Sequence, residues 1–351
     1  MKKIRVALLG AGSISALHVE SYQKLDHVEV MAICSRDGES AAKMAARYNI
    51  PCFFADYQEM LKLPEIDAVS ITTWNSSHAA AGIAALNAGK HVLCEKPLAI
   101  NAEAAQQMAA AAQANGRLLM VGFCRRFEEN VRALKELIAG GDLGEIYYAK
   151  AGMLRRWGNP GGWFAAKEKS GGGPVIDLGA HIIDLARYLM GNPQAVSVFA
   201  STFAKIGMKP GVRGAVKYTA AGGEAGNDVE DGATALVKFE NGKTLFFETS
   251  WVQHIREDDT YLELYGDKAG ARIGPDLELY ESRGDYLVNV KPVIDKRFNS
   301  FEHIFNAEIA HFITCIREGT PCICPAADGV AVQQIIDAVY QSSITGHEVL
   351  L

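Results

Sequence analysis

The chain has 351 residues, of which 49% are hydrophobic and 22% charged, and its formal net charge is -6. This length suffices for two domains, since one domain commonly has about 100–200 residues. The negative charge argues against a general nucleic-acid binder, because such proteins neutralise phosphates with clustered Lys and Arg. The apolar segment behind Met1 is too short and too interrupted by glycine for a signal peptide or a membrane span. We therefore expect a cytoplasmic protein with neither a nucleic-acid nor a membrane partner.

Seven cysteines are scattered along the chain. Several of them lie in or beside predicted buried strands, where cysteine behaves as a small apolar residue. Cys322-Ile323-Cys324 has a gap of one residue and no ligand pair nearby in the sequence, which does not fit a zinc knuckle. We predict reduced, mostly structural thiols and no bound metal.

Up to about residue 124, short apolar runs alternate with helical patterns. This alternation is typical of a parallel sheet covered by helices on both faces. Asn101 is placed to cap the second of two alanine-rich helices, and Gly116 to end it. The sequence therefore predicts an α/β fold that begins with a doubly wound Rossmann domain over residues 1–124. Its strands are expected at 4–9, 28–34, 68–72, 91–94 and 118–122, and two of its helices at 79–88 and 102–114.

From about residue 147, alternating strands follow one another. The Asn241-Gly242 pair between two of them is a strong hairpin signal. Strands joined by hairpins indicate a large open, mostly antiparallel sheet, so we expect an α+β domain over residues 125–351. Its strands are predicted at 147–154, 196–203, 233–239, 244–251 and 261–265, its helices at 177–190, 301–317 and 329–343, and a long surface loop at 205–228.

The Gly10-Ala11-Gly12 turn leads directly from the first strand into a helix that opens with Ser13 and Ile14. The first glycine permits a tight turn, and the second lets a pyrophosphate approach the backbone N–H groups at the helix start. Ser15 stands where a third glycine or alanine is usual, and it is still small. At the first strand of a βαβ series, this turn predicts a dinucleotide site.

The end of the second strand normally selects between NAD and NADP. An acidic residue there binds the ribose 2′-hydroxyl, whereas Arg accommodates a 2′-phosphate. The chain has Ser35, Arg36 and Asp37 at this place. Ser35 and Arg36 are able to hold a phosphate, but Arg36 would equally stack on adenine, and Asp37 would equally cap the next helix. The pattern favours NADP only slightly.

Polar residues follow two further strands of the predicted parallel sheet, at the edge where ligands bind. Thr73, Trp74 and His78 follow one strand, and the Glu95-Lys96-Pro97 motif follows the other. Near a nicotinamide, Lys96 would hydrogen-bond to a substrate hydroxyl and stabilise the oxyanion formed during hydride loss. The plainer alternatives are that His78 caps a helix and that Lys96 is a solvated surface residue.

Three glycines at 171–173 precede Asp177, His181 and Asp184. On a helix, residues four apart share a face, and the glycines would let a backbone segment or a ligand approach the helix start. A His paired with a carboxylate is the usual general base with a fixed tautomer. Asp184 fits a structural support. A divalent metal on the trio is the alternative.

Taken together, the glycine turn, Glu95-Lys96-Pro97 and the segment from the three glycines to Asp184 resemble the Gfo/Idh/MocA family of oxidoreductases. The resemblance covers essentially the whole chain. It implies a catalytic set of Lys96, Asp177 and His181, in which His181 exchanges the hydroxyl proton. It also implies an oligomer, a homodimer or homotetramer, formed through the carboxyl-terminal sheet. At the cofactor it implies the residues around Thr73, Trp74 and His78, together with Glu95, Lys96 and Arg126.

Arg155 and Trp163 precede the glycine run, in the region that lines the substrate site in the family. Aromatic faces and guanidinium groups suit a polyhydroxylated ring. With Lys96, Asp177 and His181 they predict a site for a pyranose sugar or cyclic polyol, although Arg155 would equally lie at a solvated sheet edge.

We therefore expect an NAD(P)-dependent sugar or polyol dehydrogenase. Two alternatives stay open. One is a redox-neutral enzyme that uses bound NAD transiently for elimination or glycoside cleavage, and the other is a non-catalytic NAD(P)-binding regulator.

Overall fold

The computed structural model describes residues 3–207 and 227–351, which form two compact units. The first unit consists of Met1–Phe127 and Arg297–Val330, and the second of Glu128–Lys296 and Ala331–Leu351. Of the loop predicted at 205–228, residues 208–226 lie outside the described residues. Within the described ranges, no helix has the length and apolar character needed to cross a membrane.

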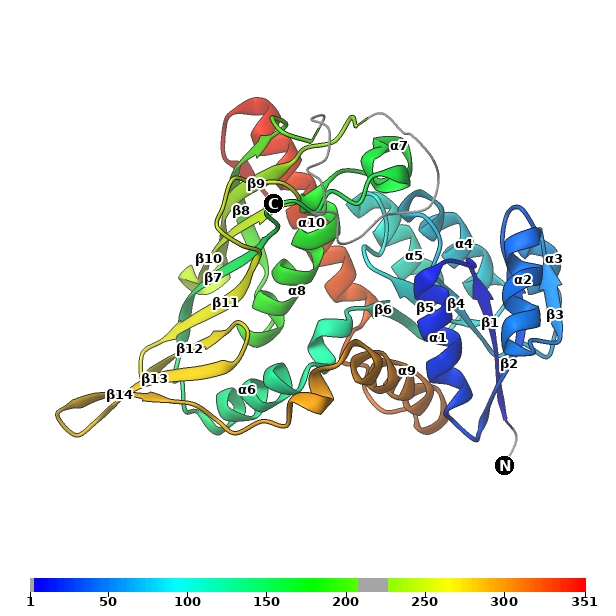
Figure 1. Cartoon of the computed structure of the whole chain (residues 1–351), viewed down its shortest axis with the longest axis horizontal. Coiled ribbons are helices and arrows are strands. Elements are labelled where there is room, and N and C mark those ends of the chain that lie inside the picture. The colour runs from blue at the N-terminus through cyan, green and yellow to red at the C-terminus, as the bar shows by residue number, and fades with distance from the viewer. Residues whose placement is uncertain (1–2, 208–226) are drawn as a thin grey trace. The chain divides into compact units, whose positions relative to one another are not determined.

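A six-stranded parallel sheet forms the first unit, in the order β3-β2-β1-β4-β5-β6 (Figure 1). The chain moves outward from β1 in one direction and then, from β4 onward, in the other, which confirms the doubly wound arrangement. The strands are β1 (Ile4–Leu9), β2 (Val28–Cys34), β3 (Cys52–Phe54), β4 (Ala68–Ile71), β5 (His91–Glu95) and β6 (Leu119–Gly122). The helices are α1 (Ser13–Gln23), α2 (Glu39–Tyr48), α3 (Tyr57–Leu61), α4 (Asn75–Asn87), α5 (Ala102–Ala114) and α9 (Phe301–Glu318).

Local sequence accounts for most of these elements. The central strands β1, β4 and β5 consist mainly of fully buried apolar side chains, as expected where helices cover both faces of a sheet. Asn101 caps α5 as predicted, since its side chain accepts a hydrogen bond of 2.8 Å from Ala104 N–H.

Helix α9 comes late in the chain, yet it packs against α1 in the first unit. The rings of His18 and Phe305 lie 5.6 Å apart, and an exposed ion pair joins Lys24 to Glu302. Contacts between residues nearly 300 positions apart leave no periodic signal in the sequence. The predicted division into domains at residue 124 stays a prediction, with 297–330 belonging to the first compact unit.

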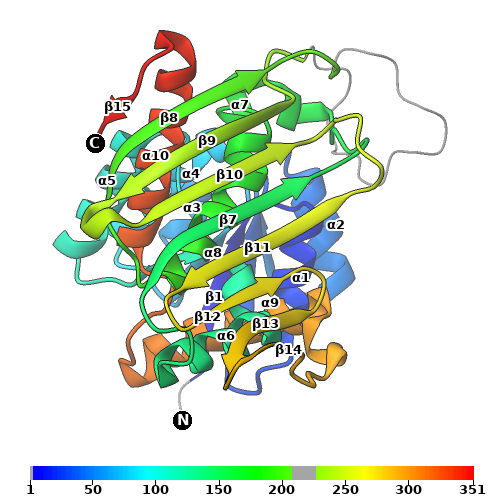
Figure 2. The same cartoon turned by 90° about the vertical axis from the view of Figure 1, so that its left-hand side faces the viewer.

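The second unit contains a nine-stranded sheet in the order β14-β13-β12-β11-β7-β10-β9-β8-β15 (Figure 2). Only β7 and β10 pair in parallel, so the predicted mostly antiparallel sheet is confirmed. The strands are β7 (Ile146–Leu154), β8 (Ala195–Phe203), β9 (Gly232–Phe239), β10 (Thr244–Ser250), β11 (Asp259–Gly266), β12 (Ala269–Ile273), β13 (Leu277–Arg283), β14 (Tyr286–Val290) and β15 (Val349–Leu350).

The hairpin predicted at Asn241-Gly242 joins β9 to β10. Asn241 and Gly242 have φ angles of 63° and 77°, the left-handed conformation that a tight hairpin turn requires. Strands β12 to β14 were not predicted. Their sequences carry charged residues and several exposed positions, so the apolar alternation is weak there.

Helices cover one face of the nine-stranded sheet. Helix α8 (Ala180–Leu189) packs against β7 and β10, and α6 (Glu129–Gly140) packs against β12. On the opposite face, Phe199, Leu236 and Phe246 lie side by side in register across β8, β9 and β10. Phe199 is 52% exposed and Leu236 39% exposed, so this apolar row faces outward in the single chain. Helix α10 (Ala326–Thr345) continues from the first unit into the second.

Candidate active site

The glycine turn joins β1 to α1, and its two glycines meet different constraints. Gly10 has a φ of +110°, and a Cβ atom there would lie 2.5 Å from the Thr72 carbonyl oxygen. The fold itself therefore requires glycine at this position. Gly12 is exposed, and a Cβ atom there would meet nothing within 4 Å. The space in front of the N-terminus of α1, where Ser13 and Ile14 begin the helix, is open to a ligand.

Ser15, the departure from the usual third glycine, has a defined role in the turn. Its buried hydroxyl accepts a hydrogen bond from Gly12 N–H (3.2 Å) and lies 2.7 Å from Thr72 Oγ1. Thr72 in turn donates to the Leu9 carbonyl (3.0 Å). This chain of contacts ties the glycine turn to the end of β4, which explains why a small polar residue serves here.

The segment after β2 stabilises the start of α2. Ser35 donates to the Asp37 carboxylate (2.9 Å) and accepts from Ala41 N–H (3.0 Å). Asp37 also accepts from Ser40 N–H (3.0 Å), so its proposed capping role is present. These hydrogen bonds, first of all the one from Ser40 N–H, lower the pKa of Asp37. Asp37 is thus a carboxylate beside the place where an adenine ribose would bind.

Arg36 is exposed, and its side chain packs over a neighbouring ring. Its guanidinium lies 4.4 Å from the centre of the Trp74 ring, in the geometry of a cation–π contact. Trp74 precedes α4, and Thr73 beside it accepts a hydrogen bond from Ser77 Oγ (3.0 Å). The structure thus brings together two predicted cofactor residues, one from the end of β2 and one from the end of β4.

His78 lies in the first turn of α4 and is fully buried. Its Nδ1 is 2.8 Å from the Pro97 carbonyl oxygen and its Nε2 is 3.2 Å from the Thr73 carbonyl oxygen. Burial is the main cause of a lowered pKa for His78, and the neutral ring that this favours donates to one of the two carbonyls and not to both. His78 therefore positions the Glu95-Lys96-Pro97 segment against the end of β4. Lys96 itself is half-buried, and its backbone N–H donates to the Glu95 carboxylate (3.2 Å).

Glu95 lies beside two residues that the sequence analysis did not single out, His18 and Glu308. Its Oε1 lies 3.0 Å from Nε2 of buried His18. Glu308 of α9 is fully buried beside them, and its two oxygens have no hydrogen-bond partner among the described residues. Burial, reinforced by the charge of Glu95, raises the pKa of Glu308 well above its usual value, so we expect it to be protonated. His18 lies 77 residues before Glu95, and Glu308 lies more than 200 residues after it, so no local pattern in the sequence indicates these contacts.

Arg126, which the family resemblance implies at the cofactor, has an internal position. Its guanidinium is buried, forms an ion pair with Asp328 (2.9 Å) and donates to the Ile323 carbonyl. These contacts hold the segment after α9 in the first unit, and the role of Arg126 at the cofactor stays a prediction.

In the second unit, the helix predicted at 177–190 begins with a short π-helical turn over Val175–Gly179 and continues as α8. Asp177 is buried in the π turn, and half-buried His181 is in the first turn of α8. Trp251, at the end of β10, donates from Nε1 to Asp177 Oδ2 (2.9 Å). Asp184 is fully buried, as expected for a support. Short π-helical turns often occur at functional sites.

The glycines before this helix are required by the protein itself. A Cβ atom at Gly172 would lie 2.0 Å from the Tyr340 hydroxyl, and one at Gly173 would lie 2.3 Å from the Glu230 carbonyl oxygen. The Glu230 carboxylate accepts from Gly173 N–H (2.9 Å), Val175 N–H (3.0 Å) and the Tyr340 hydroxyl (2.9 Å). A backbone carbonyl, that of Glu230, thus approaches Gly173, and the Tyr340 side chain approaches Gly172. Glu230 thereby caps the start of the helix that carries Asp177 and His181, a role that the sequence analysis did not predict.

Aromatic residues gather near Asp177 within the second unit. Trp163 and Phe164 stack at 3.9 Å, and Phe164 meets Trp251 edge-on at 6.3 Å. Arg155 donates to the Gly158 carbonyl (3.0 Å) and shapes the turn after β7. The predicted substrate residues Trp163, Asp177 and His181 therefore belong to segments joined by one aromatic cluster around Trp251. Lys96 belongs to the other unit.

Two family models match the chain. A model described as an oxidoreductase family with an NAD-binding Rossmann fold, GFO_IDH_MocA, matches residues 4–123, and a model of the GFO/IDH/MocA C-terminal domain matches residues 131–272.

Individual relatives cover nearly the whole chain. A D-glucoside 3-dehydrogenase of Escherichia coli (strain K12) is 36% identical, covering 99% of this chain and 97% of the relative. A myo-inositol 2-dehydrogenase of Thermotoga maritima is 26% identical, with coverage of 93% and 92%. A solved structure of levoglucosan dehydrogenase in complex with NADH and L-sorbose matches with a TM-score of 0.89 and 25% identity, and covers 100% of this chain and 99% of its own.

Proposed function

The chain belongs to the GFO/IDH/MocA family of oxidoreductases, and on that premise we propose that it transfers a hydride between a nicotinamide cofactor and a secondary hydroxyl of a pyranose sugar, glycoside or cyclic polyol. One observation carries the proposal: the open turn at Gly12 and the side chain of Lys96 follow β1 and β5 at the same edge of one parallel sheet, with β4 between them. Two strand spacings amount to about 10 Å. A dinucleotide anchored at Gly12 thus has Lys96 within reach of its nicotinamide end.

The proposed division of labour follows from the residue chemistry. The nicotinamide accepts or donates the hydride, and the protein supplies positioning and proton transfer. In the oxidation direction, His181 takes the hydroxyl proton as the hydride leaves the carbon that carries this hydroxyl. Lys96 stabilises the negative charge on the oxygen. Asp177, held by Trp251 Nε1, orients His181 and the hydroxyl.

The substrate class is supported by the aromatic cluster and by the relatives. The stacked Trp163 and Phe164 rings offer an apolar face for a sugar ring. The names of the relatives point to glucosides, levoglucosan and inositol as their substrates. We propose the residues 1–124 as the cofactor domain and the later part of the chain as the source of the substrate residues, including Arg155.

For the cofactor we propose NAD rather than NADP, in contrast to the slight preference that the sequence suggested. The Ser35 hydroxyl is already engaged with Asp37 and Ala41. The charged Asp37 carboxylate would attract a ribose 2′-hydroxyl and repel a 2′-phosphate. Arg36, stacked on Trp74, offers a flat surface to adenine in either cofactor.

The test is a panel of aldoses, glycosides and inositols assayed with each cofactor by the absorbance of reduced nicotinamide. We expect oxidation of at least one pyranoside or polyol, with kcat/KM at least about 10-fold higher for NAD, the ratio that a difference of about 1.4 kcal/mol produces. Turnover of a sugar without net NADH formation would instead establish the redox-neutral alternative. Binding of NADH without turnover of any panel member would favour the regulator and contradict the proposal.

We further propose that a second copy of the chain covers the outer face of the nine-stranded sheet, giving a homodimer or homotetramer. The row of Phe199, Leu236 and Phe246 is apolar and outward-facing, and patches of this kind mark interaction surfaces. Changing Phe199 to Glu is expected to shift the mass in solution toward the monomer. Glu257→Gln, an exposed change elsewhere in the unit, is the control. A monomeric parent protein at micromolar concentration would contradict the proposal.

A further inference from the structure

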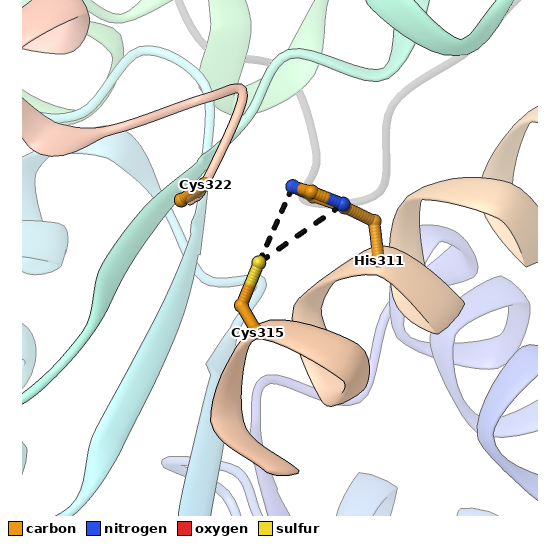
Figure 3. Close-up of side chains that lie close together, drawn as sticks. All are labelled: His311, Cys315 and Cys322. Carbon is orange, nitrogen blue, oxygen red and sulfur yellow. Dashed lines mark hydrogen bonds between the residues drawn. The ribbon is translucent and has the colours of Figure 1, made fainter. Parts of the chain in front are cut away.

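Three potential metal ligands meet at the end of α9, within the first unit. His311 and Cys315 are four residues apart on α9 and share a face of the helix. The helix ends at Gly319, whose φ of +68° turns the chain back, and Cys322 follows in the returning segment. Figure 3 shows Cys315 Sγ beside the His311 ring, with Cys322 opposite. One ligand atom from each residue lies within 4.8 Å of the other two.

The separation between Cys315 Sγ and His311 Nε2 is close to that of two ligands on one zinc ion. In tetrahedral sites Zn–S is about 2.3 Å and Zn–N about 2.0–2.1 Å, which places sulfur and nitrogen ligands about 3.6 Å apart. In this structure Cys315 Sγ lies 3.4 Å from His311 Nε2. Two thiolates and an imidazole are also the donor set that selects soft or borderline metals rather than Mg²⁺ or Ca²⁺.

In this structure the lone pair of His311 Nε2 accepts a hydrogen bond from Ile323 N–H (3.0 Å). A metal ion bound at that nitrogen would replace this hydrogen bond. The positive charge of Arg126, which donates to the Ile323 carbonyl, is balanced by Asp328 (2.9 Å).

We propose that His311, Cys315 and Cys322 form a binding site for one Zn²⁺ ion, independent of the dehydrogenase chemistry. Cys322 is only partly buried, which leaves a fourth coordination position accessible to water. The ion would cross-link α9 to the segment that follows Gly319. That segment pairs with β6 of the Rossmann sheet, because Val121 N–H donates to the Cys324 carbonyl (2.9 Å). The site would thus stabilise the edge of the cofactor-binding unit.

The spacing of Cys322-Ile323-Cys324 does not by itself indicate this site. The two further ligands stand on the preceding helix, and only the turn at Gly319 brings them to Cys322. Cys324 is fully buried and is not a member of the cluster.

Titration of the reduced, chelator-treated protein with Zn²⁺ alone tests the proposal. We expect one ion per chain, and Cys322→Ser should weaken its binding by more than the 10- to 100-fold that loss of a mere supporting hydrogen bond costs. Cys52→Ser changes a half-buried thiol of β3 outside the cluster and should bind zinc as the parent does.

A second measurement needs no variant. Alkylation of the folded parent chain, mapped by mass spectrometry, should show Cys322 and Cys315 protected by Zn²⁺ while Cys52 is unaffected. Zinc binding of equal strength in Cys322→Ser, or equal alkylation of Cys322 with and without zinc, would overturn the proposal.

Discussion

Replacing Lys96 with methionine is expected to lower kcat by about 100- to 1000-fold, the cost of removing one donor from a developing oxyanion. Methionine keeps most of the length and apolar surface of the lysine stem, so the half-buried position stays filled. The affinity for NADH should change little, because the proposed pyrophosphate site is the glycine turn. Steady-state rates on the best panel substrate, together with NADH titration by fluorescence, measure the two effects separately.

The matched control is Lys62→Met, which removes a charge from a 67% exposed lysine in the same unit. Its activity should equal that of the parent. If Lys96→Met retained full activity, Lys96 would have no part in the chemistry, and the catalytic set proposed with Asp177 and His181 would be wrong.

Replacing Gly12 with alanine is expected to weaken NADH binding by at least about 10-fold while leaving Tm unchanged. The backbone of Gly12 has φ -92° and ψ -170°, which alanine adopts without strain. Its new methyl group would meet no protein atom within 4 Å. It would instead occupy the space through which a pyrophosphate approaches the N-terminus of α1.

The comparison variant is Gly10→Ala, which should lower Tm as well as NADH affinity. Gly10 has a φ of +110°, and its Cβ atom would lie 2.5 Å from the Thr72 carbonyl oxygen. Forcing alanine into such a conformation destabilises a protein by more than about 1 kcal/mol. Calorimetry and NADH titration of both variants separate the glycine that the fold needs from the one that the ligand needs. Unchanged NADH affinity in Gly12→Ala would contradict the proposed cofactor site.

Contacts between distant segments changed the interpretation of several predicted residues. Arg126, which the family resemblance places at the cofactor, forms an ion pair with Asp328, about two hundred positions later, and its cofactor role stays a prediction. Ser15 looked like a defect in the glycine pattern, yet it connects the turn to Thr72. In both cases the partner is distant in the chain, so residue type and local spacing could not identify it.

The sequence by itself determined the two sheets, most of their strands, the glycine turn and the Glu95-Lys96-Pro97 motif, because each depends on local periodicity or on a short motif with its own physical reason. Tertiary structure alone decided which groups surround these motifs. It places Trp251 against Asp177 and Glu230 at the start of the helix that carries Asp177. It also places Glu308 beside Glu95, and His311 beside Cys315 and Cys322. These groups are fixed by packing between segments that are remote in sequence. Packing of that kind depends on the whole fold, and a single segment carries no trace of it.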